Sequence, residues 1–137
     1  MINFYIASSF ANKGIVQKIS RQLKQLGFIH TYDWTQNERV ASYEQLRKIG
    51  EEEMKAVKRA DFLVVLLPGG KGSHIELGIA LGAEVPVYLY ASDDRHNDFD
   101  KTSTFYHLKE VKQVIGTEAD LINTILFDFP IKGEVEI

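Results

Sequence analysis

The chain has 137 residues, of which 45% are hydrophobic and 26% are charged, and its formal net charge is -3. This length suits one compact domain, which we expect to span residues 1–137. Because the sequence contains no cysteine, disulfides, thiolate zinc sites and cysteine nucleophiles are excluded. Lys and Arg are spread along the chain without forming a basic stripe, so we expect no nucleic-acid partner.

The N-terminal stretch MINFYIASSF lacks the basic region and the apolar core of a signal peptide. No apolar run in the sequence reaches the roughly 20 residues that cross a membrane. We therefore expect a soluble, cytoplasmic protein without a membrane partner.

Apolar residues recur along the chain first in short runs and then at helical spacing, and this alternation repeats. The predicted elements, in chain order, are a strand over residues 3–7, a helix over 15–26, a strand over 28–32, a helix over 42–60, a strand over 62–67, a helix over 73–81, strands over 85–90 and 111–114, and a helix over 117–127. Gly27 is typical of a helix C-terminus, and Ser42 with Gln45 has the spacing of a capping box at a helix N-terminus.

Regular alternation of strands and helices predicts a parallel sheet with helices on both faces. The run FLVVLL over residues 62–67 is apolar without alternation, as in a central strand that is covered on both faces. We therefore expect a single-domain α/β fold, a doubly wound parallel sheet of about five strands of the flavodoxin or Rossmann kind. Ligands of such sheets bind where the strands end, which here means loops 7–13, 33–41, 68–73 and 91–104.

The third of these loops is rich in glycine, in the stretch PGGKGSHIELG over residues 68–78. Gly69, Gly70 and Gly72 remove side chains where a strand turns into a helix, so backbone N–H groups there could approach an anionic or polyhydroxyl ligand. The spacing is neither the G-x-G-x-x-G of dinucleotide-binding folds nor a Walker loop, because Lys71 is not followed by Ser or Thr. A tight turn without a ligand remains the alternative.

Glu76 has two interpretations from local sequence. Ser73 and Glu76 fit a capping box, in which Ser73 caps the helix and Glu76 reaches back to its amide. Alternatively, a carboxylate in the first helical turn beside the ligand crevice could serve as a nucleophile or a base. His74, which lies between them, either faces solvent or touches the ligand.

The stretch GSHIELGIALG, the following EVPVYLY and the first-strand stretch FYIASSF resemble the nucleoside 2-deoxyribosyltransferase-like family, over most of the chain. That family includes nucleoside deoxyribosyltransferases and 2'-deoxynucleoside 5'-phosphate N-hydrolases. The resemblance implies that Glu76 attacks the anomeric carbon and forms a covalent glycosyl enzyme. It implies that Glu53 takes the place of an aspartate that positions the nucleophile and the sugar, and that Tyr5 and Ser9 line the sugar or its 5' end.

The sequence departs from the family pattern at two further positions. Gly70 stands six residues before Glu76, where many transferases carry an aspartate, and Ala11 stands near the point where the phosphohydrolases carry an arginine. Cleavage of an N-glycosidic bond places positive charge on the sugar, which a carboxylate beneath it would stabilise. Trp34 or Tyr32 could stack on the base, although Trp34 could equally belong to the core.

The resemblance also implies that no metal or organic cofactor is needed and that a second subunit completes the site. We therefore expect a homodimer or a higher even oligomer. The apolar residues available for such a contact, or else for ordinary core packing, are Met54, Val57, Phe105, Tyr106 and the tail over residues 127–137.

Two alternatives for the function stay open. PGGKGSHIE is also similar to the PGG-x-G-T-x-x-E stretch of cytokinin-activating phosphoribohydrolases, with Ser73 in place of threonine. These proteins also cleave N-ribosidic bonds, so both resemblances imply a small-molecule nucleoside or nucleotide as substrate. The second alternative is a module that senses a nucleotide without cleaving it.

Overall fold

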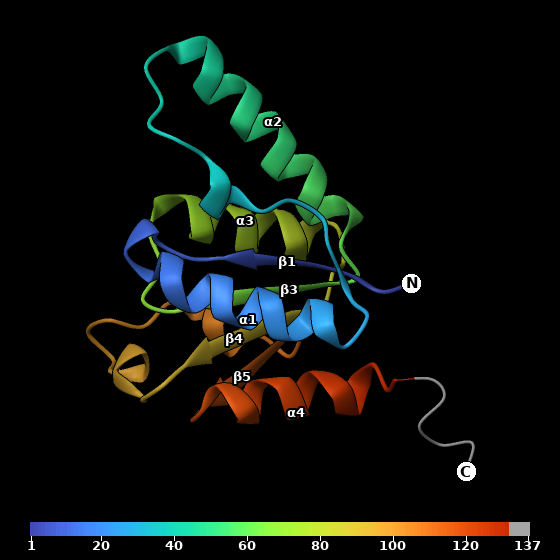
Figure 1. Cartoon of the computed structure of the whole chain (residues 1–137). Coiled ribbons are helices and arrows are strands. Elements are labelled where there is room, and N and C mark those ends of the chain that lie inside the picture. The colour runs from blue at the N-terminus through green and yellow to red at the C-terminus, as the bar shows by residue number, and fades with distance from the viewer. Residues whose placement is uncertain (132–137) are drawn as a thin grey trace.

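Five parallel strands form one sheet, in the order β2-β1-β3-β4-β5, in the computed structural model, which describes residues 1–131 (Figure 1). The strands are β1 (Asn3–Ala7), β2 (Ile29–His30), β3 (Phe62–Leu66), β4 (Val87–Ala91) and β5 (Val111–Ile115). The helices are α1 (Lys13–Gln25), α2 (Tyr43–Arg59), α3 (Lys71–Gly82) and α4 (Glu118–Asp128). Short 3-10 turns occupy η1 (Phe10–Asn12), η2 (Trp34–Gln36), η3 (Arg95–Asn97) and η4 (Thr104–His107). The predicted α/β fold is confirmed.

Helices cover both faces of the sheet, with α2 and α3 on one side and α1 and α4 on the other (Figure 1). All five residues of β3 are buried, as the unbroken apolar run predicted. In this strand order the chain reverses its direction of winding between β1 and β3. Sheets of this kind bind ligands in the crevice at that point, outside the carboxyl ends of the strands. The loops after β1 and β3 are therefore the ones placed to hold a ligand.

Two strands differ from their predicted bounds by two residues at one end. β2 pairs with β1 through Ile29 and His30 alone, at the edge of the sheet, so the predicted strand over 28–32 is too long. β4 begins at Val87, later than predicted, because the Val85 N–H donates to Ala80 O at the end of α3 and Pro86 has no N–H to give to a ladder.

The helix starts follow local side-chain chemistry. Ser42 Oγ accepts from the Gln45 N–H, as predicted, although the Gln45 side chain accepts from the Ala41 amide instead of completing the box. At α4, Thr117 and Asp120 cap each other reciprocally. None of the helices in residues 1–131 is long and apolar enough to cross a membrane.

Residues expected to be available for subunit contact divide into two groups. Val57 and Tyr106 are buried within the chain, so for these two the alternative of ordinary core packing is the correct one. Met54 and Phe105 are exposed. Most of the predicted tail contact, residues 132–137, lies outside the described residues.

Candidate active site

Three side chains from separate elements meet between the sheet and the α2–α3 layer. Tyr5, from the middle of β1, donates its phenol proton to Glu76 Oε2 of α3 across 2.6 Å. The Tyr5 hydroxyl also lies 3.4 Å from Glu53 Oε2 of α2. The resemblance had linked these three residues to one site, and the fold brings them into contact.

Tyr5 reaches this layer because side chains alternate along a strand, so its neighbours in β1 point to the opposite face. Burial and the two nearby carboxylates raise the pKa of the Tyr5 phenol far above its usual range, so the hydroxyl keeps its proton and acts as a donor. A phenol has one proton to give, and a 2.6 Å bond is much stronger than a 3.4 Å contact. Glu76 is therefore the partner of Tyr5, and Glu53 is a close neighbour.

Glu76 is a buried carboxyl group, with 8% of its surface exposed. Burial raises its pKa to about 7; the hydrogen bond from Tyr5 opposes this effect and the charge of Glu53 adds to it. Of the two carboxylate oxygens of Glu76, Oε2 alone has a hydrogen-bond partner among residues 1–131. The side chain is thus held by one oxygen, while Oε1 has no hydrogen-bond partner in this part of the chain.

Glu53 lies in the C-terminal half of α2 and is partly buried. Burial also raises its pKa, and the contact with Tyr5 opposes that effect. Glu53 and Glu76 both lie against the Tyr5 hydroxyl, and ionisation of both carboxyl groups at once is unfavourable because like charges at short range repel. Glu53 can therefore influence the protonation of Glu76.

The capping-box interpretation of Glu76 is wrong. α3 begins at Lys71, two residues before the predicted start, and Gly70 is its N-cap. Ser73 closes this end from within the first turn: its Oγ accepts from Gly70 N at 2.7 Å and donates to Gly70 O at 2.9 Å. Glu76 consequently lies in the second turn and makes its bond to Tyr5 instead of to the helix end.

The three glycines of the loop after β3 differ in whether packing would allow a side chain at their position. At Gly69 a Cβ atom would collide with Ser73 Oγ, so internal packing requires glycine there. At Gly70 a Cβ would only reach ordinary contact with Ser9 Cβ, and at Gly72 it would meet nothing within 4 Å. Packing within the chain does not require glycine at the last two positions, which leaves the backbone of α3's N-terminus open.

The loops after β1 and β3 are tied together by hydrogen bonds to main-chain oxygens. Ser8 Oγ donates to Leu66 O at 2.8 Å, and Ser9 Oγ donates to Pro68 O at 3.2 Å. Asn12 Nδ2 donates to Pro68 O at 2.9 Å and to Ser8 Oγ at 3.0 Å. Sequence reasoning singled out Ser9 and missed Asn12, whose position just before a helix gave no signal of a partner 56 residues away.

His74 connects the glycine loop to the segment before β5. Its Nδ1 lies 2.8 Å from Gly70 O, which can only accept, so Nδ1 carries a proton. Its Nε2 lies 2.7 Å from the Tyr106 hydroxyl. In the structure, His74 braces the loop, so its ring nitrogens are already engaged.

Trp34 is buried, with 8% of its surface exposed, and its Nε1 donates to Ile6 O at 2.7 Å. Its core role, one of the two alternatives, is what the structure shows. Phe10 packs on it with ring centroids 6.3 Å apart and is itself 65% exposed at the carboxyl end of β1. Sequence reasoning missed Phe10, although an aromatic residue directly after the Ser-Ser of the first loop was an available signal.

Among residues 1–131 no three His, Asp or Glu side chains are grouped so that they could hold a metal ion. The acidic run Glu51 to Glu53 divides accordingly: Glu51 and Glu52 face solvent, and Glu53 turns toward Tyr5.

A family model described as nucleoside 2-deoxyribosyltransferase matches residues 4–121. No curated protein matches the sequence significantly. A conserved protein from Enterococcus faecalis V583 is 21% identical, with a TM-score of 0.69 over 93% of this chain and 99% of that one. The Clostridium botulinum CMP N-glycosidase is 14% identical, with a TM-score of 0.64 over 90% and 97%. A 2-deoxyribosyltransferase from Bacillus psychrosaccharolyticus is 19% identical, with a TM-score of 0.61 over 95% and 97%. All three share the fold.

Proposed function

The chain belongs to the nucleoside 2-deoxyribosyltransferase family, and we propose that it cleaves or transfers at the N-glycosidic bond of a nucleoside or nucleotide through Glu76. The observation that carries this proposal is the bond from Tyr5 to Glu76, which fixes a buried carboxylate by one oxygen and leaves the other free. The solved relatives that share the fold include a CMP N-glycosidase and a 2-deoxyribosyltransferase.

In the proposed reaction, Glu76 Oε1 attacks C1' of the sugar. The bond between C1' and the base nitrogen breaks, its electron pair leaves with the base, and a glycosyl ester forms on Glu76. Water or a second base then attacks C1' and releases the carboxylate. The Glu76 charge stabilises the cationic character of the sugar in both steps.

Tyr5 and Glu53 position and tune the nucleophile. Tyr5 fixes the rotamer of Glu76 and stabilises its charged form, since a hydrogen bond to the carboxylate lowers its pKa. Glu53 acts in the opposite direction through its charge. Ser9, Gly70, Gly72, Ser73 and His74 shape the crevice on the other side, where we place the sugar and its 5' end.

We assign the base to the exposed ring of Phe10. The ring follows β1 directly, rests on the buried indole of Trp34, and has the Lys13 ammonium 5.4 Å from its centroid. An aromatic face held from below in this way can stack on a planar base. Trp34 then contributes indirectly, by supporting Phe10.

Glu76→Gln tests the proposal, because glutamine keeps the size and the bond from Tyr5 but is a poor nucleophile. Base release from a panel of ribonucleosides, deoxynucleosides and their 5'-monophosphates, followed by chromatography, should fall by about a thousandfold or more. Glu52→Gln, on the exposed face of α2, is the matched control and should retain full activity. A fully active Glu76→Gln protein, or tight binding of a nucleotide that is returned uncleaved, would contradict the proposal; a second base added to the assay distinguishes transfer from hydrolysis.

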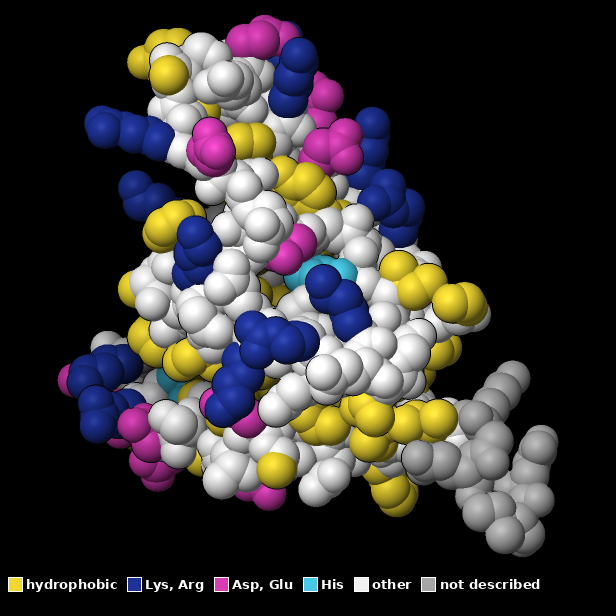
Figure 2. All heavy atoms as spheres, in the orientation of Figure 1, with side chains coloured by type: hydrophobic (Ala, Val, Ile, Leu, Met, Phe, Trp, Pro, Cys, Tyr) yellow, Lys and Arg dark blue, Asp and Glu magenta, His cyan; other side chains and the backbone are white. Residues whose placement is uncertain are grey.

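We also propose that the protein forms a homodimer or a higher even oligomer. Part of α2 extends beyond the sheet, and apolar side chains stand among the charged ones on this extension (Figures 1 and 2). Tyr43, Leu46 and Met54 are exposed on α2, and Phe105 of η4 is 57% exposed. An amphipathic helix gains stability mainly by burying its apolar face, which a second copy of the chain would allow.

A further inference from the structure

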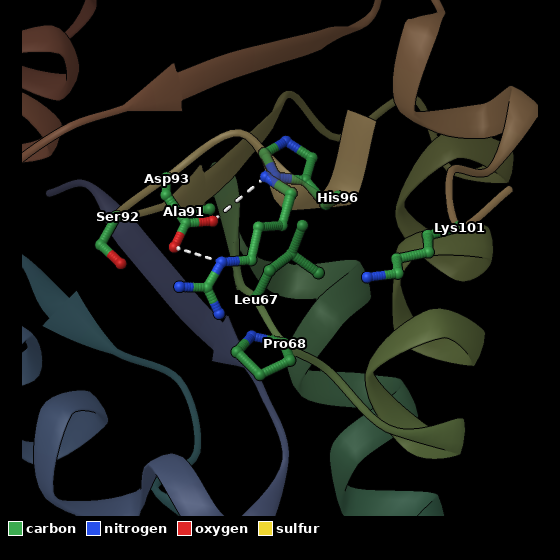
Figure 3. Close-up of a pocket in the computed structure, with 8 residues that line it drawn as sticks. Leu67, Pro68, Ala91, Ser92, Asp93, His96 and Lys101 are labelled. Carbon is green, nitrogen blue, oxygen red and sulfur yellow. Dashed lines mark hydrogen bonds and ion pairs between the residues drawn. The ribbon is translucent and has the colours of Figure 1, made fainter. Parts of the chain in front are cut away.

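A pocket of about 280 Å³ lies between the end of β3 and the segment that follows β4 (Figure 3). It belongs to the loop over residues 91–104, which is also at the ligand-binding edge of the sheet. Its lining residues are Leu67, Pro68, Ala91, Ser92, Asp93, Arg95, His96 and Lys101. The lining contains two permanent positive charges and one negative charge.

Asp93 orients Arg95. Its Oδ1 accepts from the Arg95 backbone N–H at 3.1 Å, and its Oδ2 lies 3.3 Å from Arg95 Nε. These contacts engage Nε of the guanidinium, and within residues 1–131 its terminal nitrogens form no hydrogen bond or ion pair. The terminal pair is the part of arginine that binds two anionic oxygens at once.

Lys101 approaches the pocket from the opposite side (Figure 3). Within residues 1–131 the Lys101 ammonium has no ion-pair partner, whereas Arg95 is paired through Nε only. The Ser92 hydroxyl, which also lines the pocket, adds a neutral donor. The arrangement suits a compact polyoxygen anion.

The segment that follows β4 and carries Arg95 is held in place by hydrogen bonds to Gln113 of β5. Gln113 Oε1 accepts from Asn97 Nδ2 at 3.0 Å and lies 2.9 Å from His96 Nε2. Gln113 Nε2 donates to Tyr106 O at 3.1 Å, which fixes the orientation of the amide. Backbone held in this way loses less conformational entropy when a ligand binds.

Pro68 links the pocket to the crevice. One side of this residue lines the pocket, and its carbonyl accepts from Ser9 and Asn12 of the first loop. In the first loop, the Lys13 ammonium lies over the ring of Phe10. Arg95 and Lys101 place two positive charges in the pocket that Pro68 lines.

We propose that this pocket is the phosphate subsite of the enzyme and that Arg95 and Lys101 select nucleoside 5'-phosphates over nucleosides. This assignment rests on the proposed function for the identity of the sugar-bearing substrate. The phosphate receives two N–H donors from the Arg95 guanidinium and one from the Lys101 ammonium. Each charge-assisted bond changes affinity by about 10- to 100-fold.

The kinetic test compares one nucleoside with its own 5'-monophosphate. The wild-type protein should prefer the phosphate by kcat/KM, and in Arg95→Gln/Lys101→Gln this preference should fall at least tenfold, mainly through KM. Arg21→Gln/Lys109→Gln removes the same charges from exposed positions outside the pocket and should keep the wild-type preference. A double pocket variant with an unchanged preference overturns the proposal.

A binding test separates this inference from the proposed function, because it needs no turnover. Ribose 5-phosphate should shift the amide resonances of Ser92 and His96 in the wild-type protein, whereas ribose and an equal concentration of inorganic phosphate should shift them much less. The shift should disappear in Arg95→Gln/Lys101→Gln. The binding test stands even if no substrate releases its base. The phosphate-subsite proposal is overturned if the double variant keeps the resonance shift, or if ribose and ribose 5-phosphate shift the resonances equally.

Discussion

Tyr5 Oη lies 2.6 Å from Glu76 Oε2, and this hydrogen bond joins the middle of β1 to the second turn of α3. It is buried, and its donor keeps its proton because burial and the nearby carboxylates raise the pKa of the phenol. The bond therefore stabilises the ionised form of Glu76 against the burial that disfavours it.

The activity of the wild-type protein should rise with pH through about 7. Burial raises the Glu76 pKa to about 7, and only the deprotonated carboxylate can attack C1'. The measurement is kcat/KM for base release between pH 5 and 9, where the acidic limb should have a slope of one. A limb centred near pH 4.5, the ordinary value for glutamate, would contradict this assignment.

Tyr5→Phe should move the acidic limb of the kcat/KM profile to higher pH. Removing the phenol removes the hydrogen bond that lowers the Glu76 pKa and leaves the burial that raises it. We expect kcat/KM at pH 7 to fall by about 10- to 100-fold, with partial recovery at pH 9. Tyr88→Phe, whose hydroxyl bonds Asp128 away from this site, is the control and should keep the wild-type profile.

Glu53→Gln should move the limb in the opposite direction. The charge of Glu53 raises the Glu76 pKa, so its removal lowers the pH at which Glu76 ionises. The readout is the midpoint of the acidic limb, which separates this effect from a general loss of activity. An unchanged midpoint would show that Glu53 does not act on Glu76 through charge.

Glu76→Gln should stabilise the protein at alkaline pH. The folded pKa of about 7 lies above the reference value of 4.5, so the wild type loses stability as pH rises between these values. Ionising Glu76 in the fold then costs about 3 kcal/mol, given about 1.4 kcal/mol per pKa unit. Urea unfolding should show a gain of about 2–3 kcal/mol for the variant at pH 8 and almost none at pH 4.5. Equal differences at both pH values would contradict the buried charge.

Leu46→Glu/Met54→Glu should dissociate the assembly. Both side chains are exposed on α2, and two carboxylates on an apolar contact would leave buried charges without partners. Light scattering should report a monomer at micromolar concentration, with circular dichroism unchanged. Glu51→Gln/Glu52→Gln, on the same helix, should leave the oligomeric state as in the wild type. A wild type that is monomeric and fully active would contradict an assembly-dependent site.

The sequence by itself determined the class of the fold. The apolar run over residues 62–67 predicts a central strand because a strand covered on both faces shows no polar alternation, and β3 is that strand. Gly27, with φ of 94°, ends the turn after α1 as predicted, because glycine adopts positive φ without steric cost. These signals are local, and each depends on a few neighbouring residues. The family resemblance, carried by a contiguous motif, was readable for the same reason.

Only the tertiary structure decided what Glu76 does within the fold. Local spacing allowed a capping box, whereas the actual partner is 71 residues away on β1. The contact exists because β1 lies beside β3 in the sheet and α3 packs over both, a relationship that no sequence spacing encodes. The same holds for Arg95 and Lys101, whose convergence depends on how the segment after β4 folds back against Gln113. Periodicity records which face of an element is buried, but which side chains meet across that face depends on the packing of whole elements.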